Sequence, residues 1–290
     1  SDSFNLSISL EEDVEALDQV VVLGYVSQKA SNISGAVSTV GSEDVDKLKP
    51  VRMEDALQGL PGVNMFSNGA PGAKPTVIIR GVTSYTGNDP LVIVDGINQS
   101  LDDMNSLEPS DIESISVLKD ASTTALYGVK GGNGVIVITT KSGSRNQEAK
   151  FTFNTSYGQQ SPEKTIGVLN ASEYAAILNE MSVSSGGGLI FTDISNLGEG
   201  TDWQKEIFRI DAPIITNNIS VSGGTNNSSY FLSAGFTGQE GILYGGDKNY
   251  FDRSTFRGNF DIDLSSKLNM KISNRYTCLL YTSPSPRDGT

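Results

Sequence analysis

Three short apolar runs, each rich in β-branched residues, lie close together in the first half of the chain. They cover residues 77–79, 91–94 and 135–140, and glycine, aspartate and proline lie between them. Short apolar runs bounded by turn-forming residues predict strands joined by tight connections. We therefore expect one compact sheet between residues 77 and 141, with a short helix over residues 121–127.

The composition excludes several classes of function. The chain has 290 residues, no histidine, one cysteine and a formal net charge of −13. Without histidine there is no imidazole for acid–base catalysis, for activating a serine or cysteine nucleophile, or for a His/Cys zinc site. An acidic chain also lacks the basic face that binds nucleic acid phosphates. We expect no enzyme activity, no metal site, no cofactor and no nucleic acid partner.

Two motifs that suggest ligand sites have simpler explanations. The glycines between residues 128 and 134 precede a predicted strand, whereas a phosphate-binding loop needs Gly-Lys-Ser/Thr at the start of a helix. We expect these glycines to supply positive φ angles in tight turns. Asp102, Asp103 and Asp111 lack the spacing of an EF-hand calcium loop, so a solvated loop is the better interpretation.

Short elements are expected ahead of the sheet. Residues 42–45, Ser-Glu-Asp-Val, carry a helix-start signature with a hydroxyl cap and early acidic residues. Residues 53–60 predict a short helix that ends at a Pro-Gly pair. Residues 4–10 alternate as a strand does. Residues 18–25 hold a β-branched segment, which suits either an ordinary buried strand or an edge strand added to a partner's sheet.

From residue 149 onward, long amphipathic strands are predicted. Phe151, Phe153 and Tyr157 share one face of the first strand, and apolar residues in 256–264 alternate with Arg257, Asn259, Asp261 and Asp263. Strands of about 9–11 residues with one apolar and one polar face, joined alternately by tight turns and longer loops, are typical of a transmembrane barrel. A soluble sandwich whose polar face meets water shows the same alternation.

Several motifs in residues 16–277 occur in an order that resembles one protein family. Residues 55–63, Asp-Ala-Leu-Gln-Gly-Leu-Pro-Gly-Val, come first, and the pairs Arg80-Gly81, Asp95-Gly96, Lys119-Asp120 and Tyr127-Gly128 follow. The sequence resembles the SusC/RagA-like group of TonB-dependent outer-membrane receptors. The resemblance implies an α+β plug domain, with a small mixed sheet and short helices, followed by the first antiparallel strands of a transmembrane β-barrel.

The resemblance also implies how the chain is divided. Residues 1–17 would end an N-terminal β-sandwich extension, residues 18–40 would hold the TonB box and a linker, residues 41–144 the plug, and residues 149–277 the N-terminal part of the barrel. Residues 278–290 resemble translated sequencing-adapter read-through, since two prolines follow where a strand should continue. The chain does not begin with a signal peptide, and about four to five barrel strands follow the plug, so we expect a fragment of a longer receptor.

Two sets of residues are expected to carry the function that the resemblance implies. The segment that TonB grips, the TonB box, consists of Asp18, Gln19, Val20, Val21, Val22, Leu23, Gly24 and Tyr25. Contacts between plug and barrel are expected from residues at strand ends and turns, namely Arg80, Gly81, Asp95, Gly96, Lys119, Asp120, Tyr127 and Gly128. Of these, Arg80 is the strongest candidate for an ion pair with the barrel lumen.

A receptor of this kind is expected in the outer membrane of a Gram-negative cell, in contact with lipid, with its TonB box in the periplasm. It would import oligosaccharides or peptides beneath a SusD/RagB-like surface lipoprotein, with TonB supplying the force that displaces the plug. A soluble β-rich carbohydrate-binding protein remains an alternative, although Trp203 is the one tryptophan available for an aromatic platform. A secreted hydrolase would need a carboxylate pair, and none occurs in a recognisable context.

Overall fold

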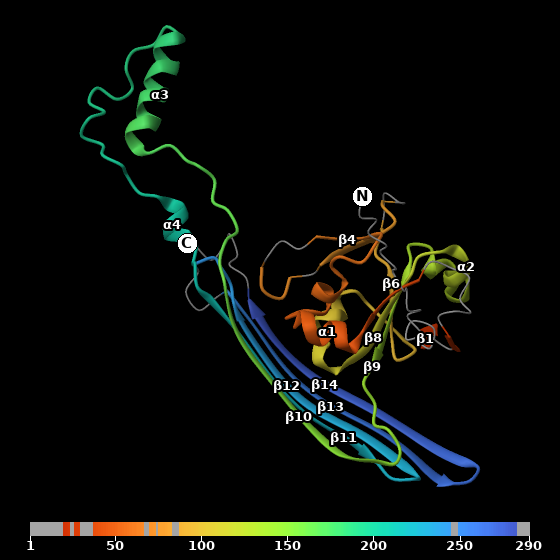
Figure 1. Ribbon diagram of the computed structural model, residues 1–290. Helices are drawn as coiled ribbons and strands as arrows, with labels where there is room; N and C mark the ends of the chain where they lie inside the picture. Colours follow the sequence, from red (N-terminus) through yellow and green to blue (C-terminus); the bar gives the residue numbers. More distant parts are fainter. Residues whose placement is uncertain are drawn as a thin grey trace, which may run out of the picture.

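The computed structural model describes residues 20–23, 26–29, 37–66, 70–73, 75–82, 87–244 and 249–282. The chain forms a small α+β domain, here called the plug, and a five-stranded antiparallel sheet of β10–β14, here called the strand sheet. The plug lies on one face of the strand sheet (Figure 1). This is the fold class that the resemblance implies.

Five strands form the mixed sheet of the plug, in the order β3-β8-β9-β6-β7. They are β3 (Val37–Gly41), β6 (Leu91–Val94), β7 (Ile97–Gln99), β8 (Ile112–Leu118) and β9 (Val135–Thr140). The central β9 pairs antiparallel with β8 and parallel with β6. Strands that are covered on both faces have continuous apolar sequences, which explains the unbroken runs in β6 and β9.

One of the three apolar runs lies outside this sheet. β5 (Thr76–Ile79) pairs antiparallel with β4 (Val63–Phe66) in a separate two-stranded sheet. The expectation of a single sheet over residues 77–141 is therefore wrong at its first strand. Val77 and Ile79 are still buried, because they pack in the same hydrophobic core as residues of β6, β8 and β9. Apolar composition predicts that β5 is buried but not which strand it pairs with.

Short helices fill the connections of the plug, and η marks those of 3-10 type. They are α1 (Ser42–Leu48), η3 (Met53–Leu57), η4 (Asp102–Ser106), η5 (Pro109–Asp111), α2 (Ala121–Thr124) and η6 (Ala125–Gly131). The N-cap of α1 is Gly41, which makes no side-chain cap, so the hydroxyl cap expected at Ser42 is wrong. Glu43 and Asp44 do lie in the first turn, where negative charge stabilises a helix.

Gly134 shows why a glycine-rich turn precedes β9. Its φ is +95°, and a Cβ at this position would lie 2.8 Å from Ile79 Cδ1. Residues with a side chain rarely adopt such a φ. The glycine therefore lets the turn form and lets β5 approach the start of β9, in agreement with the role expected for this run of glycines.

The strand sheet consists of five strands in chain order, each antiparallel to the next. They are β10 (Gln147–Gln160), β11 (Ala212–Gly224), β12 (Ser228–Glu240), β13 (Tyr250–Ser265) and β14 (Leu268–Thr282), with 13 to 16 residues each. Short turns join them at one end and long connections at the other (Figure 1). The longest connection carries α3 (Ala171–Ser184) and α4 (Trp203–Ile207). β14 continues through Thr282, beyond residue 277, where the alternation of the sequence stops.

The two faces of the strand sheet differ in polarity. The face turned away from the plug carries exposed apolar side chains, including Phe151, Phe153, Ile219, Phe256 and Tyr276. The opposite face presents buried polar side chains to the plug, namely Asn218, Ser233, Thr237, Arg253, Thr255 and Arg257. The sequence predicts this separation for β13, because successive side chains of a strand point to opposite faces.

Ahead of the plug, β1 (Val20–Leu23) and β2 (Val26–Lys29) form a two-stranded antiparallel sheet. Asp18, Gln19, Gly24 and Tyr25 lie outside the described residues, as does the strand expected at residues 4–10. Within the described ranges, no helix is long and apolar enough to cross a membrane. Since β3 belongs to the plug sheet, the plug begins at or before Val37 and not at residue 41.

Candidate functional site: the interface between plug and strand sheet

Two arginines on β13 connect the strand sheet to the plug. Arg253 and Arg257 are four residues apart on one strand, so their side chains lie on the same face. They are 1% and 3% exposed. A buried cation is costly unless it is paired and hydrogen-bonded. The partners of these two side chains therefore define the interface.

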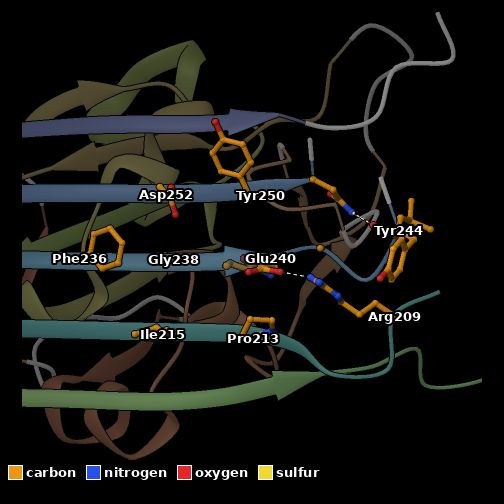
Figure 2. Close-up of a pocket in the computed structure, with 13 residues that line it drawn as sticks. Arg209, Pro213, Ile215, Phe236, Gly238, Glu240, Tyr244, Tyr250 and Asp252 are labelled. Carbon is orange, nitrogen blue, oxygen red and sulfur yellow. Dashed lines mark hydrogen bonds and ion pairs between the residues drawn. The ribbon is translucent and has the colours of Figure 1, made fainter. Parts of the chain in front are cut away.

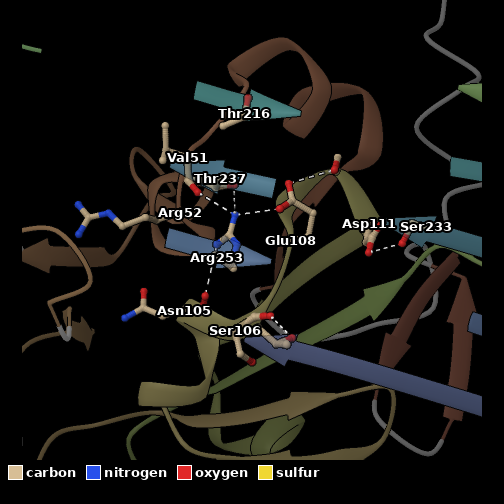
Figure 3. A network of polar contacts seen from close by, with 12 residues as sticks. Val51, Arg52, Asn105, Ser106, Glu108, Asp111, Thr216, Ser233, Thr237 and Arg253 are labelled. Atoms are coloured by element: carbon tan, nitrogen blue, oxygen red, sulfur yellow. Dashed lines mark hydrogen bonds and ion pairs between the residues drawn. The ribbon is translucent and has the colours of Figure 1, made fainter. Parts of the chain in front are cut away.

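Arg253 lies at the centre of a network of polar contacts (Figure 3). Its Nη2 atom is 3.0 Å from Glu108 Oε2 and donates to the carbonyl oxygen of Val51 at 3.2 Å. The same atom donates to Thr237 Oγ1 at 3.1 Å, and Nη1 donates to the carbonyl oxygen of Asn105 at 3.3 Å. One guanidinium thus joins three separate parts of the plug to β12 and β13.

Arg257 bonds to a different edge of the plug. Its Nη2 atom is 3.4 Å from Asp95 Oδ2 and also donates to Thr140 Oγ1, while Nη1 donates to the carbonyl oxygen of Asp111 at 3.3 Å. Asp95 has a φ of 49° in the turn between β6 and β7, where Gly96 follows with a φ of 83°. Because its carboxylate also accepts from the backbone N–H of Thr140 at 3.0 Å, it is held in place against β9.

Asp111 places a buried carboxyl group at this interface. It is 4% exposed, and its Oδ2 atom accepts a hydrogen bond from Ser233 Oγ at 2.7 Å. Burial raises the pKa of Asp111 to about 6. The hydrogen bond from Ser233 and the charge of Arg257 act against this rise. This side chain therefore changes charge near neutral pH.

Further contacts extend the interface along β13 and β14. Arg275 Nη2 donates to Gln99 Oε1 at 3.2 Å, and Thr277 Oγ1 donates to the carbonyl oxygen of Ser106 at 3.0 Å. Arg145, in the link between plug and β10, pairs with Asp261 at 2.9 Å and with Asp263. Hydrogen bonds and ion pairs thus attach the plug to β12, β13 and β14, and each needs a donor or cation on one side opposite an acceptor or anion on the other.

One hollow lies at this interface, and a second lies on the outer face of the strand sheet. A cleft of about 600 Å³ separates α1 from the polar side chains of β10 and β11. A second hollow of about 700 Å³ lies at the long-connection end of the strands, where Arg209 pairs with Glu240 and its guanidinium carbon is 5.6 Å from the centre of the Tyr244 ring (Figure 2). Neither contains a metal-binding arrangement, since no three His, Cys, Asp or Glu side chains of the described residues gather in one place.

Comparisons with known proteins agree with this architecture. A family model described as TonB-dependent Receptor Plug Domain matches residues 29–135. The TonB-dependent receptor SusC of Bacteroides thetaiotaomicron is 34% identical over 287 residues, which cover 93% of this chain and 28% of the relative. The TonB-dependent receptor P26 of Formosa agariphila is 35% identical over 278 residues, covering 94% of this chain and 28% of that protein.

Solved structures match both bodies of the fold at once. The RagAB peptide importer in its open-open state superposes with a TM-score of 0.75 and 31% identity, over 89% of this chain and 32% of that one. The chain belongs to the SusC/RagA-like TonB-dependent receptors. The siderophore receptor PirA of Acinetobacter baumannii, at 19% identity and a TM-score of 0.55, shares the fold alone. The chain spans 28% of the length of each of these two curated relatives, P26 and SusC.

Within this receptor chain, the residues expected to connect plug and barrel separate into two groups. Asp95 meets the strand sheet through Arg257. Arg80 instead pairs with Asp120 inside the plug, and Lys119 donates to Ser38 Oγ at 2.5 Å. The remaining members form turns or pack inside the plug: Gly81 and Gly128 at positive φ, Gly96 beside Asp95, and Tyr127 against a small apolar cluster. Within the described residues Arg80 therefore bonds inside the plug, and an ion pair from Arg80 to the barrel lumen stays a prediction.

Four receptor residues of this interface were not predicted as contacts. They are Glu108, Asp111, Arg253 and Arg257. Asp111 was considered as a calcium ligand, and Arg257 as a member of a polar strand face. The available signal was a pair of arginines on a strand whose inward positions are otherwise uncharged until Asp261. Such a pair requires anions opposite it if the face is buried.

Proposed function

We propose that this receptor imports a nutrient across the outer membrane when TonB displaces its plug. One observation carries the proposal: a plug held by buried ion pairs on the polar face of a sheet whose other face is apolar. A plug attached by polar contacts can leave and return, since its detached surface is wetted without exposing a large apolar area. The apolar face suits contact with outer-membrane lipid.

We infer that TonB binds the segment of Asp18, Gln19, Val20, Val21, Val22, Leu23, Gly24 and Tyr25. Val20–Leu23 form β1 of a two-stranded sheet, in which each strand has one edge that pairs with no other described strand. A free edge offers backbone N–H and C=O groups to an added strand. The segment also precedes the plug in the chain, so a pull on it is transmitted to the plug.

The cargo and the surface partner are inferred from relatives. The named relatives include a SusC receptor and a RagAB peptide importer. We propose an oligosaccharide or peptide as the substrate and a SusD/RagB-like lipoprotein as the partner. Hydroxyl and amide side chains line the cleft beside β10 and β11 together with charged ones such as Lys141 and Lys150, and they support a polar cargo because all of them form hydrogen bonds.

Replacing Val22 by proline tests the TonB assignment. In the register of β1 with β2, the backbone N–H of Val21 faces Gln28, so that of Val22 faces the opposite edge of β1. Proline removes this donor from any strand that TonB adds, so Val22→Pro should reduce both TonB pull-down and energised uptake by the receptor with its complete barrel. Val22→Ala keeps the donor and serves as the matched control, expected to behave like the parent. Unchanged pull-down and uptake in Val22→Pro would refute the assignment of this segment.

A further inference from the structure

The polar contacts between plug and strand sheet begin at a definite point in the chain. Along the described residues from Val37, the first one bonded to a strand-sheet side chain is Val51, through Arg253 Nη2 at 3.2 Å. Residues 37–50, here called the leading segment, hold β3, α1 and the two residues after α1. Every plug residue that Arg253 binds lies behind the leading segment in the chain.

The leading segment is lightly attached to the rest of the plug. β3 is an edge strand that pairs with β8 on one side. Val40 and Val45 are its buried side chains, 7% and 2% exposed. The next helix, η3, is embedded more deeply, since Met53 and Leu57 are both 0% exposed in the core. On leaving, the leading segment breaks this one ladder and the bonds of Ser38 with Lys119, of Thr39 with Ser116 and of Asp46 with Lys141.

A pull from TonB reaches the leading segment first. β1 and β2 precede β3 in the chain, so tension on β1 passes along the backbone into β3 and then α1. The bond between Arg253 and Val51 meets that tension immediately after the leading segment. Glu108 and Asn105, bound by the same guanidinium, connect this point to the η4–η5 region. Arg253 therefore lies where it can hold Val51 and the plug residues after it in place when the leading segment detaches.

The cleft of about 600 Å³ lies directly beside the leading segment. Its first wall is formed by α1 and the residues after it, including Asp46 and Lys49. The opposite wall includes Thr152, Asn154 and Thr216 on β10 and β11. Departure of the leading segment removes the first wall and leaves the second in place. The cleft then widens into a passage lined by hydroxyl and amide groups and by the charged side chains of Glu108, Lys141 and Lys150.

We propose that TonB releases the leading segment alone, that Arg253 retains the plug from Val51 onward, and that a polar solute passes through the widened cleft beside β10 and β11. The inference rests on the transport function proposed above. It makes Arg253 a positioning residue, which limits how much of the plug moves.

Two disulfides test this boundary, one that joins β8 to β3 and one that joins β8 to β9. Thr39 on β3 and Ser116 on β8 face each other, with hydroxyl oxygens 3.3 Å apart. Ser114 on β8 and Thr139 on β9 also face each other. Facing residues on antiparallel strands lie close enough for a disulfide. In the receptor with its complete barrel and Cys278 replaced by serine, T39C/S116C should abolish TonB-dependent uptake, and a reductant should restore it.

The control S114C/T139C joins β8 to β9, two plug strands that both keep their place during transport. Its uptake should therefore equal that of the parent, whether the disulfide is oxidised or reduced. If both disulfides block uptake, release passes beyond Val51 and the inference is overturned. If neither blocks it, β3 does not separate from β8, which also overturns the inference. If the cysteine-free parent shows no TonB-dependent uptake, the failure lies in the proposed function itself.

A labelling experiment tests the role of Arg253. Val45→Cys and Ala56→Cys, 2% and 1% exposed in the parent, report on either side of the boundary. During TonB-dependent uptake, a polar maleimide should label Val45→Cys and leave Ala56→Cys unlabelled. When Arg253→Met is added, Ala56→Cys should also be labelled during TonB-dependent uptake. The same double variant should stay unlabelled when TonB is absent. Labelling of Ala56→Cys with Arg253 intact, or no change with Arg253→Met, would contradict the proposal.

Discussion

A single guanidinium, that of Arg253, carries much of the attachment between plug and strand sheet. Replacing it with methionine leaves Glu108 buried without its cation, and breaking a buried pair in this way costs about 3–5 kcal/mol. We expect Arg253→Met to lower the free energy of unfolding by this amount in denaturant titrations of the purified receptor. Arg145→Met is the matched control, since that arginine is 39% exposed and solvent weakens an exposed ion pair, so its loss should change stability far less. Equal effects of the two substitutions would contradict the assignment.

Asp111 gives the interface a pH dependence of known sign. Its pKa is about 6 in the folded receptor, against an ordinary value of 3.8 for an aspartate, so the folded state holds this proton more tightly. The stabilisation from protonation is complete below about pH 4 and is lost as pH rises through 6, a difference of up to about 3 kcal/mol. The groups around the carboxyl are Arg257, Glu108, Lys141 and the Ser233 hydroxyl.

Asp111→Asn isolates this contribution, because the amide is neutral at every pH and keeps an oxygen that can accept from Ser233. Stability measured between pH 5 and pH 8 should fall less steeply with rising pH in Asp111→Asn than in the parent. Glu113→Gln, on the exposed side of β8, removes a carboxylate without changing the interface and should follow the parent curve. Superposable curves for Asp111→Asn and the parent would show that Asp111 does not titrate in this range.

At the scale of elements, local patterns predict strands and faces but not partners. The alternation of Phe256 with Arg257 predicts two faces of β13, as the structure shows. The partner of Arg253, however, is Glu108, which lies 145 residues earlier in the chain. Likewise β5 is recognisable as a buried strand, yet its pairing with β4 depends on packing of the plug core. The pairing of Arg80 with Asp120 has the same character, because the two residues come together only in the folded plug.

At the scale of the whole molecule, one substitution distinguishes a lipid-facing sheet from a water-facing one. Phe256 lies on the outer face of β13 and is 56% exposed. If that face meets lipid, Phe256→Lys costs about 2–4 kcal/mol near the bilayer midplane and should reduce the folded receptor recovered from outer membranes. Phe256→Leu stays apolar and should fold in parental amounts, and Ile210→Lys, in the long connection before β11, should be tolerated. Were the outer face wetted, lysine at position 256 would cost no more than at position 210, which would contradict the lipid contact proposed for this face.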